Sequence, residues 1–296
     1  MNVIGNKYVF LGCSGLLIAA SIVVIGTLGL KQGIDFTGGT MWQVTLGDER
    51  VNADGAKAFL SDELKLDDAI VTPEPATQSF LIRTKEIDEA KHVEYKAAFV
   101  KAYPNFEELR FDSIGPAIGS ELRSRAIWAF LFVLLGISLY IAFAFRKVSY
   151  PVSSWKYGLI TLLTLFHDAI IPTGLFAVLG YLYHAEVDTN FIVAILVVMG
   201  FSVHDTIVVF DRIRENLRLE RSAKFDFDAL VNTSVNETMA RSINTSLTLV
   251  LVLVALYFLG SSSLAYFTLT ILVGTVFGTY SSIFVASPLL TMWRKR

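Results

Sequence analysis

Long apolar runs dominate the pattern of hydrophobic and polar positions along the chain. Six runs approach or exceed the roughly 20 residues that a helix needs to cross about 30 Å of hydrocarbon. They cover residues 8–30, 126–145, 157–183, 190–210, 243–259 and 264–292. This pattern predicts a polytopic α-helical membrane protein with six transmembrane helices. The first run is long for a signal peptide and no clean cleavage site closes it, so we expect a retained helix.

The polar stretch between the first two runs has the pattern of a small α+β domain. Four segments alternate or read as strands: 41–46, 69–72, 79–84 and 106–112. Two segments have helical periodicity: 52–64, which Asn52 can cap, and 88–103, which Pro104 ends. The order β-α-β-β-α-β is that of the ferredoxin-like split unit. We therefore expect a ferredoxin-like domain over 31–122 and a five-helix region over 123–293, with a loop at 211–242.

Basic residues between the runs predict the orientation in the membrane. Six Lys or Arg residues lie between positions 211 and 244. Others lie in the loop between the second and third runs or end the chain: Arg146, Lys147, Lys156, Arg294, Lys295 and Arg296. The loops at 184–190 and 260–263 contain neither Lys nor Arg. The positive-inside rule therefore places both termini in the cytoplasm and the α+β domain outside.

Composition excludes several classes of function. The chain is 53% hydrophobic and 18% charged with a net charge of −2, and no basic patch indicates a nucleic-acid partner. Its single cysteine, Cys13, lies inside the first apolar run. A disulfide framework or a thiolate metal site within the chain is therefore excluded.

Two aspartates lie inside apolar runs, where a charge costs at least about 2.5 kcal/mol and indicates function by default. Asp168 lies in the third run and Asp205 in the fourth, and each follows a histidine, His167 or His204. Burial favours the protonated acid and a nearby arginine favours the ionised one. An acid and a movable arginine can therefore form a proton switch, with Asp205 and Arg241 as the expected relay.

Helical spacing predicts three polar stripes on consecutive helices. The stripes are Thr161, Thr164 and Asp168; Ser202, Asp205 and Thr206; and Arg241, Asn244, Thr245 and Thr248. We expect these stripes to face one another as a hydrated seam open toward the cytoplasm, where Arg241 can pair with Asp205. The alternative is that the hydroxyl and histidine side chains only join helices by hydrogen bonds. Gly274 and Gly278 indicate close helix packing.

Four motifs carry a resemblance to a known family. They are GIDFTGGT at 33–40, FSVHDTIVVFDRIREN at 201–216, RSINTSLT at 241–248 and VGTVFGTYSSIFVASPLL at 273–290. Together they resemble the SecF family of bacterial protein-export membrane proteins, in the resistance-nodulation-division superfamily. The resemblance covers essentially the whole chain. It implies an inner-membrane translocation subunit that acts with SecD and the SecYEG channel on unfolded preproteins.

The resemblance implies coupling to the proton motive force, with protons but no cofactor or nucleotide. It places the family's transmembrane acid on Asp205 and its arginine on Arg241. Family members often have asparagine at the position of His204, which argues against an essential role for that histidine. The family motif at the outer membrane edge contains Gly33, Asp35, Gly38 and Gly39, and we interpret its glycines as a turn. The motif lacks the GK[ST] sequence that ends a phosphate-binding loop, so it does not predict a nucleotide site.

Several other functions compete with this interpretation. A proton-driven exporter of lipids or small molecules usually has two six-helix halves in one chain. An intramembrane aspartyl protease built on Asp168 and Asp205 would need a GxGD pattern, which is absent. A metal site from His167, Asp168, His204 and Asp205 is disfavoured because neighbouring helical side chains diverge by about 100°. The last alternative is a scaffold that only tethers its outside domain. No enzymatic activity is expected.

Overall fold

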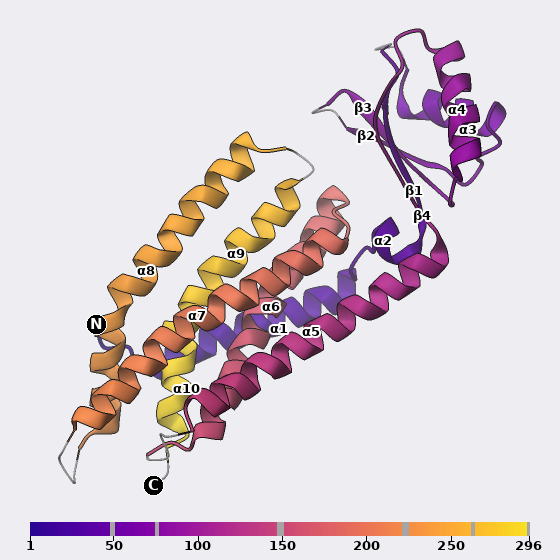
Figure 1. The fold of residues 1–296 in the computed structure, drawn as a ribbon. Coiled ribbons are helices and arrows are strands. Elements are labelled where there is room, and N and C mark those ends of the chain that lie inside the picture. The colour runs from indigo at the N-terminus through magenta and orange to yellow at the C-terminus, as the bar shows by residue number, and fades with distance from the viewer. Residues whose placement is uncertain (48–50, 75–76, 147–150, 221–224, 262–263, 295–296) are drawn as a thin grey trace. The chain divides into compact units, whose positions relative to one another are not determined.

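The computed structural model describes residues 1–47, 51–74, 77–146, 151–220, 225–261 and 264–294. Five of the basic residues that predict the orientation lie outside these residues: Lys147, Arg221, Lys224, Lys295 and Arg296. Two compact units form, one of Met1–Lys31 with Ile127–Arg296 and one of Gln32–Ala126. The first unit contains the bundle of long helices and the second contains the α+β fold (Figure 1).

Six helical segments of the described residues are long and apolar enough to cross a membrane, which confirms the predicted number. Five are single helices: α1 (Lys7–Leu28), α5 (Pro116–Ala144), α6 (Ser154–Tyr183), α7 (Thr189–Leu219) and α8 (Phe227–Leu259). The last span consists of α9 (Ala265–Ser281), the π-helical turn η2 (Ser282–Ala286) and α10 (Ser287–Met292).

Most of the stretch 211–242, expected as a cytoplasmic loop between spans, is helical, because α7 continues to Leu219 and α8 already begins at Phe227. Polar residues can extend a helix beyond its apolar part when they satisfy one another. Arg214 pairs with Asp211 one turn earlier in α7, and Asp226 caps α8 by accepting from the backbone N–H of Ala229 at 3.3 Å. Hydropathy thus located the apolar part of each helix but not its end.

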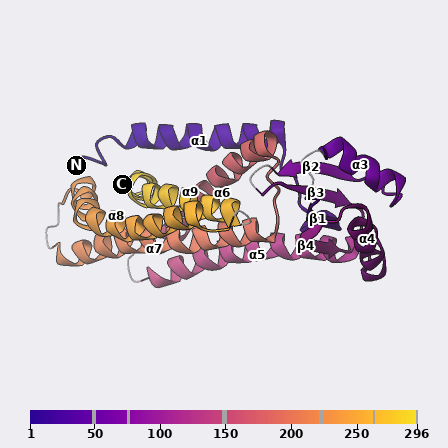
Figure 2. The ribbon, with the colours of Figure 1, turned by 90° about the horizontal axis from the view of Figure 1, so that it is seen from above.

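Helix α9 occupies the centre of the bundle, where it packs against α6, α7 and α8. Two glycines allow this approach: a Cβ on Gly274 would lie 2.3 Å from a Val198 methyl carbon, and one on Gly278 would lie 3.0 Å from the Ser202 Cβ. The predicted packing role of these glycines is confirmed. Seen from above, α1 and α5 lie on opposite sides of the bundle (Figure 2).

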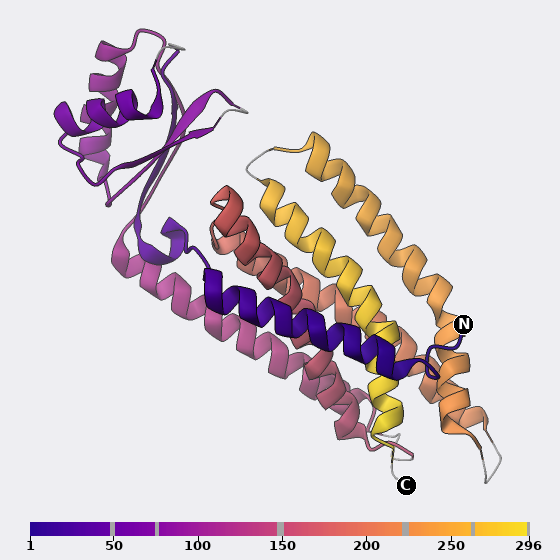
Figure 3. The ribbon, with the colours of Figure 1, turned by 180° about the vertical axis from the view of Figure 1, so that it is seen from behind.

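The outer helices keep most of their apolar surface exposed. Only 6% of the apolar window of α1 and 11% of that of α5 and of α8 is buried, against 56% for α6 and for the last span. Figure 3 shows α1 from its exposed side, and its other side packs against α6 and η2. These exposed surfaces fit contact with lipid or with another membrane protein.

The second unit has the β-α-β-β-α-β order that the sequence predicts. It contains the short helix α2 (Ile34–Thr37), then β1 (Gly39–Thr45), α3 (Ala53–Asp62), β2 (Ile70–Glu74), β3 (Ser79–Thr84), α4 (Glu89–Ala102) and β4 (Glu107–Ile114). All strand pairs are antiparallel and the sheet order is β2-β3-β1-β4, the ferredoxin-like arrangement. Asn52 caps α3 as predicted, accepting from the N–H of Gly55 at 2.8 Å.

Candidate functional site

Asp205 lies in the interior of the bundle, where three helices meet. Its residue is 5% exposed, and its Oδ2 accepts hydrogen bonds from Ser246 Oγ of α8 at 3.1 Å and from Thr279 Oγ1 of α9 at 3.0 Å. The two hydroxyl oxygens are also 2.5 Å from each other. Asp205 therefore has hydroxyl partners on both neighbouring helices, and the group can be held in one place whether or not it carries a proton.

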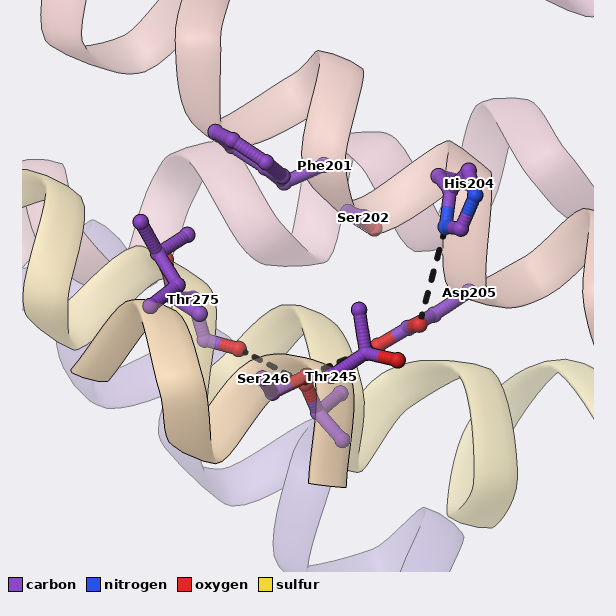
Figure 4. A pocket seen from close by; sticks show the side chains of 9 residues that line it. Phe201, Ser202, His204, Asp205, Thr245, Ser246 and Thr275 are labelled. Carbon is purple, nitrogen blue, oxygen red and sulfur yellow. Dashed lines mark hydrogen bonds and ion pairs between the residues drawn. The ribbon is translucent and has the colours of Figure 1, made fainter. Parts of the chain in front are cut away.

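A small cavity of about 30 Å³ opens beside this carboxylate, which is enough room for a water molecule. Its lining comes from α7, α8 and α9: Phe201, Ser202, His204, Asp205, Thr245, Ser246, Leu249, Thr275 and Thr279 (Figure 4). Hydroxyl groups, one carboxylate and the His204 imidazole supply the polar part of this lining. The cavity can therefore bring water or a proton to the acid.

His204 is a poor candidate for a buried proton carrier. Its side chain is 66% exposed, and its Nδ1 lies 4.0 Å from Asp205 Oδ1, beyond hydrogen-bonding distance (Figure 4). Thr206, the other neighbour of Asp205, is fully buried and donates to the Ser202 carbonyl oxygen of its own helix at 3.2 Å. Among the residues that line the cavity, Asp205 is the only carboxylic acid.

The structure does not contain the expected pair between Arg241 and Asp205. Arg241 is exposed on α8 and makes no ion pair within the described part of the chain. It precedes Ser246 by five residues, which places the two side chains about 140° apart around the helix. The inward face of α8 instead carries Ser242, which is 1% exposed, and Ser246 one turn later.

The predicted polar stripe on α8 therefore faces outward rather than into a seam. Asn244, Thr245 and Thr248 are exposed like Arg241, and among these four only Thr245 also lines the cavity. The spacing predicts that these four residues share one face of the helix, and they do. It does not predict the direction of that face, because the helix carries polar residues on two sides.

Asp168 forms a second polar cluster, which is closed. The residue is 0% exposed, and its carboxylate accepts from His167 Nδ1 at 2.7 Å, from Ser281 Oγ at 2.7 Å and from Ser202 Oγ. His167 is 1% exposed, and its Nε2 is buried without a hydrogen-bond partner within the described residues. The first two predicted stripes do meet here, through Asp168 of α6 and Ser202 of α7.

Sequence reasoning missed the hydroxyl groups that complete both clusters. Ser246 of α8 and Thr279 and Ser281 of the last span all lie outside the three predicted stripes. A signal was present in the sequence, because Ser242 and Ser246 are four residues apart, as are Thr275 and Thr279. Such spacing marks one helix face.

The GIDFTGGT motif forms the short helix α2 and the turn into β1. Gly33 precedes α2, Asp35 lies in its first turn, and Gly38 ends it with φ 73°. Gly39 has φ 123°, and a Cβ there would lie 2.8 Å from the carbonyl oxygen of Thr84. Only glycine fits these backbone conformations without strain, which confirms the interpretation as a turn.

The fold and the site together define a multi-pass membrane transport protein. Six apolar spans hold two buried carboxylates in hydroxyl-rich surroundings, and a ferredoxin-like domain follows the first span. Intramembrane acids of this kind mark ion or proton pathways. Transporters with parallel repeats are built from two such six-helix halves, of which this chain supplies one.

Comparison with known proteins identifies the family. The model of the protein export membrane protein SecD/SecF, C-terminal, matches residues 94–296, and that of the SecD/SecF GG motif matches residues 23–47. Protein translocase subunit SecF of Thermobaculum terrenum is 40% identical over 307 residues, covering 100% of this chain and 95% of that protein. The chain belongs to the SecD/SecF family, as a SecF-type subunit of the Sec protein-export machinery and not an enzyme.

The relative in Thermus thermophilus is a translocase subunit SecDF. It is 36% identical, and the match covers 95% of this chain but 37% of that protein. The crystal structure of SecDF from that organism, described as a translocon-associated membrane protein, matches with a TM-score of 0.83 at 35% identity. The match covers 99% of this chain and 38% of that one. Since SecD and SecF are one chain there, the similarity implies that this chain associates with SecD.

Proposed function

We propose that this chain, together with SecD, uses the proton motive force to promote preprotein translocation across the cytoplasmic membrane. Asp205 is the residue that takes up and releases the proton. The observation that carries the proposal is its buried carboxylate inside a membrane span, next to a cavity with room for water. Maintaining an ionisable group at such a site is costly, and an amide would serve equally well as a helix contact.

Arg241 acts as the counter-charge of Asp205 in another conformation of the complex. In the structure the arginine is exposed on α8, the same helix that supplies Ser246 to the acid. Rotation of α8 about its axis would withdraw Ser246 and turn Arg241 toward the carboxylate, and the long arginine side chain would span the roughly 7.5 Å that separate the two residues along the helix. A positive charge favours the ionised acid, so its approach would release the proton and its withdrawal would allow uptake.

SecD covers the exposed polar stripe of α8. Arg241, Asn244, Thr245 and Thr248 lie exposed along one side of a membrane span, where contact with lipid is unfavourable for an arginine in particular. A protein partner with polar groups of its own removes this cost. The second six-helix half of the transporter fits this role, and it would place Arg241 at the interface between the halves.

Both termini face the cytoplasm and the α+β domain faces the periplasm. The support is the distribution of Lys and Arg, which are absent from the loops at 184–190 and 260–263 and frequent in the loops on the other side. In this orientation the domain lies where preprotein emerges. Unfolded preprotein and the SecYEG channel are accordingly the expected partners, and the lipid bilayer of the bacterial inner membrane is the environment.

Export driven by the proton motive force tests this proposal. Inverted membrane vesicles that contain the chain with SecD are compared with vesicles that carry Asp205→Asn or Arg241→Met. Asp211→Asn and Arg218→Met are matched controls, because both residues are exposed on α7 outside the cavity. We expect the first two variants to assemble but to lose the stimulation, and the controls to keep it. If the proton motive force stimulates export fully in Asp205→Asn, the proposal is wrong and the alternative of a scaffold that only tethers its outside domain is favoured.

A further inference from the structure

Asp168 is a buried acid that the proposed proton step does not use. Its carboxylate accepts hydrogen bonds from residues on three helices: His167 of α6, Ser202 of α7 and Ser281 of α9. Every member of this cluster is at most 3% exposed, and none of them lines the cavity beside Asp205 except Ser202. A buried, fully hydrogen-bonded carboxylate adds little to stability, but it can specify one arrangement of the groups around it.

Helix α9 is held between the two carboxylates of the bundle. Thr279 donates to Asp205, whereas Ser281 donates to Asp168. Two residues along a helix correspond to about 200°, so these hydroxyls leave α9 on opposite sides. Helix α7 also reaches both clusters, through Ser202 and Asp205. Rotation of α9 that broke the Ser281 contact would therefore withdraw Thr279 from Asp205.

The backbone is irregular on both sides of the contact between Asp168 and Ser281. The last span changes to a π-helical turn at Ser282, immediately after Ser281. In α6, Pro172 lies four residues after Asp168 and removes the N–H that would bond to the Asp168 carbonyl oxygen. Helices with such interruptions adjust their local geometry more readily than regular ones, and single π turns are frequent at functional sites.

We propose that Asp168 is a positioning residue, which fixes the rotation of α9 so that Thr279 and Ser246 keep their hydroxyl groups on Asp205. This inference rests on the proposed function of Asp205 and assigns Asp168 no proton of its own to transport. A residue that only joined helices would change the amount of assembled protein. A positioning residue changes the behaviour of Asp205 in the protein that has assembled.

Substitution of Ser281 tests the contact without removing a charge. Ser281→Ala deletes the hydrogen bond to Asp168 together with the contact to the Gly278 carbonyl oxygen of α9, and Ser281→Thr keeps a hydroxyl at the same position. Ser287→Ala is the matched control, because Ser287 is also fully buried in the last span but bonds to the Ser282 carbonyl oxygen of that span. Per assembled molecule, we expect Ser281→Ala to lower the proton-motive-force stimulation of export about two- to tenfold. Ser281→Thr and Ser287→Ala retain it.

A double-mutant cycle tests whether Ser281 acts through Thr279. If it does, Ser281→Ala combined with Thr279→Val reduces the stimulation no further than the larger single effect. If the two effects multiply, the hydroxyls act independently and the positioning role is wrong.

Reaction of Asp205 with a hydrophobic carbodiimide provides a measurement that does not depend on export. Labelling of this residue is followed by mass spectrometry at fixed pH in membranes that contain the full chain and SecD. We expect Ser281→Ala to change the labelling rate at least about twofold, in the same direction as Thr279→Val. Labelling like that of Ser287→Ala would overturn the inference. Normal export by Asp205→Asn would instead overturn the proposed function, and the labelling result would still decide the role of Asp168.

Discussion

Glu108 of the α+β domain offers a quantitative test of the packing around its sheet. Its carboxylate is 18% exposed and accepts hydrogen bonds from His92 Nε2 at 2.7 Å, Lys96 Nζ at 2.9 Å and Trp42 Nε1 at 2.9 Å. His92 also stacks on Phe111 with ring centroids 3.6 Å apart. The carboxylate thus links α4 to β1 across the domain core, and its removal should loosen both elements.

The magnitude follows from the contacts that an amide cannot make. Glu108→Gln keeps one acceptor oxygen and loses the charge, so about two charge-assisted hydrogen bonds are lost and a buried donor remains unpaired. Bonds to charged groups contribute about 1.5–3 kcal/mol each, and partial exposure places the total at about 2–4 kcal/mol. For a unit of this size that loss lowers Tm by about 10–20 °C.

The pH dependence has a definite sign. Burial alone would raise the pKa of Glu108, but the hydrogen bonds from His92 and Lys96 outweigh it and lower that pKa below its ordinary value of 4.5. A carboxyl group whose pKa is lowered by folding stabilises the folded state above its unfolded pKa. The difference between native and Glu108→Gln proteins should therefore be complete at neutral pH and shrink as pH falls below about 4.5.

Thermal unfolding of the full chain in detergent measures this effect. Trp42 fluorescence reports on the domain once the other three tryptophans are replaced by phenylalanine. Glu107→Gln is the control, because Glu107 is the exposed neighbour on the same strand. If Glu108→Gln unfolds within about 2 °C of Glu107→Gln at neutral pH, the cluster does not stabilise the domain and the reasoning is refuted.

Three further predictions concern the bundle and the orientation. Gly274→Ala should lower the stability by about 1–3 kcal/mol in detergent melts, because its Cβ would lie 2.3 Å from a Val198 methyl carbon, whereas Gly200→Ala, with open space, should not. Asn232→Ala should speed proteolysis of the amino-terminal segment, because the backbone N–H groups of Val3 and Ile4 donate to Asn232 Oδ1 at 2.9 and 3.2 Å. An unchanged rate of cleavage would contradict this. In a chain without Cys13, Thr77→Cys should react with an impermeant maleimide added from the periplasmic side. Reaction only after the membrane is permeabilised would show that the orientation is opposite to the one proposed.

The spans and the α+β domain could be predicted because their patterns are local. An apolar run of about 20 residues in a membrane protein predicts a transmembrane helix. The order of strands and helices identifies the ferredoxin-like unit. The ends of α7 and α8 could not be predicted from hydropathy. Their polar ends are held by ion pairs and caps, as between Arg214 and Asp211, which leave no apolar signal.

The site was predicted in part for a similar reason. The cost of a charge in the membrane identifies Asp168 and Asp205 wherever they point. The direction of α8 needed tertiary information, since the helix carries Ser246 on its inward face and Arg241 on its exposed face. When a helix has two polar faces, its sequence does not show which face points toward the acid. Only the packing of the bundle shows this. Thr279 was missed because a threonine in a span is usually bonded to its own helix.

Proton movement during translocation tests the central claim most directly. Inverted vesicles that contain the chain with SecD and the channel are loaded with a pH-sensitive dye and supplied with preprotein. The account predicts that protons pass with the native chain only while preprotein is translocated, and that Asp205→Asn abolishes this flux while Asp211→Asn preserves it. An equal, translocation-dependent flux with Asp205→Asn would contradict the account.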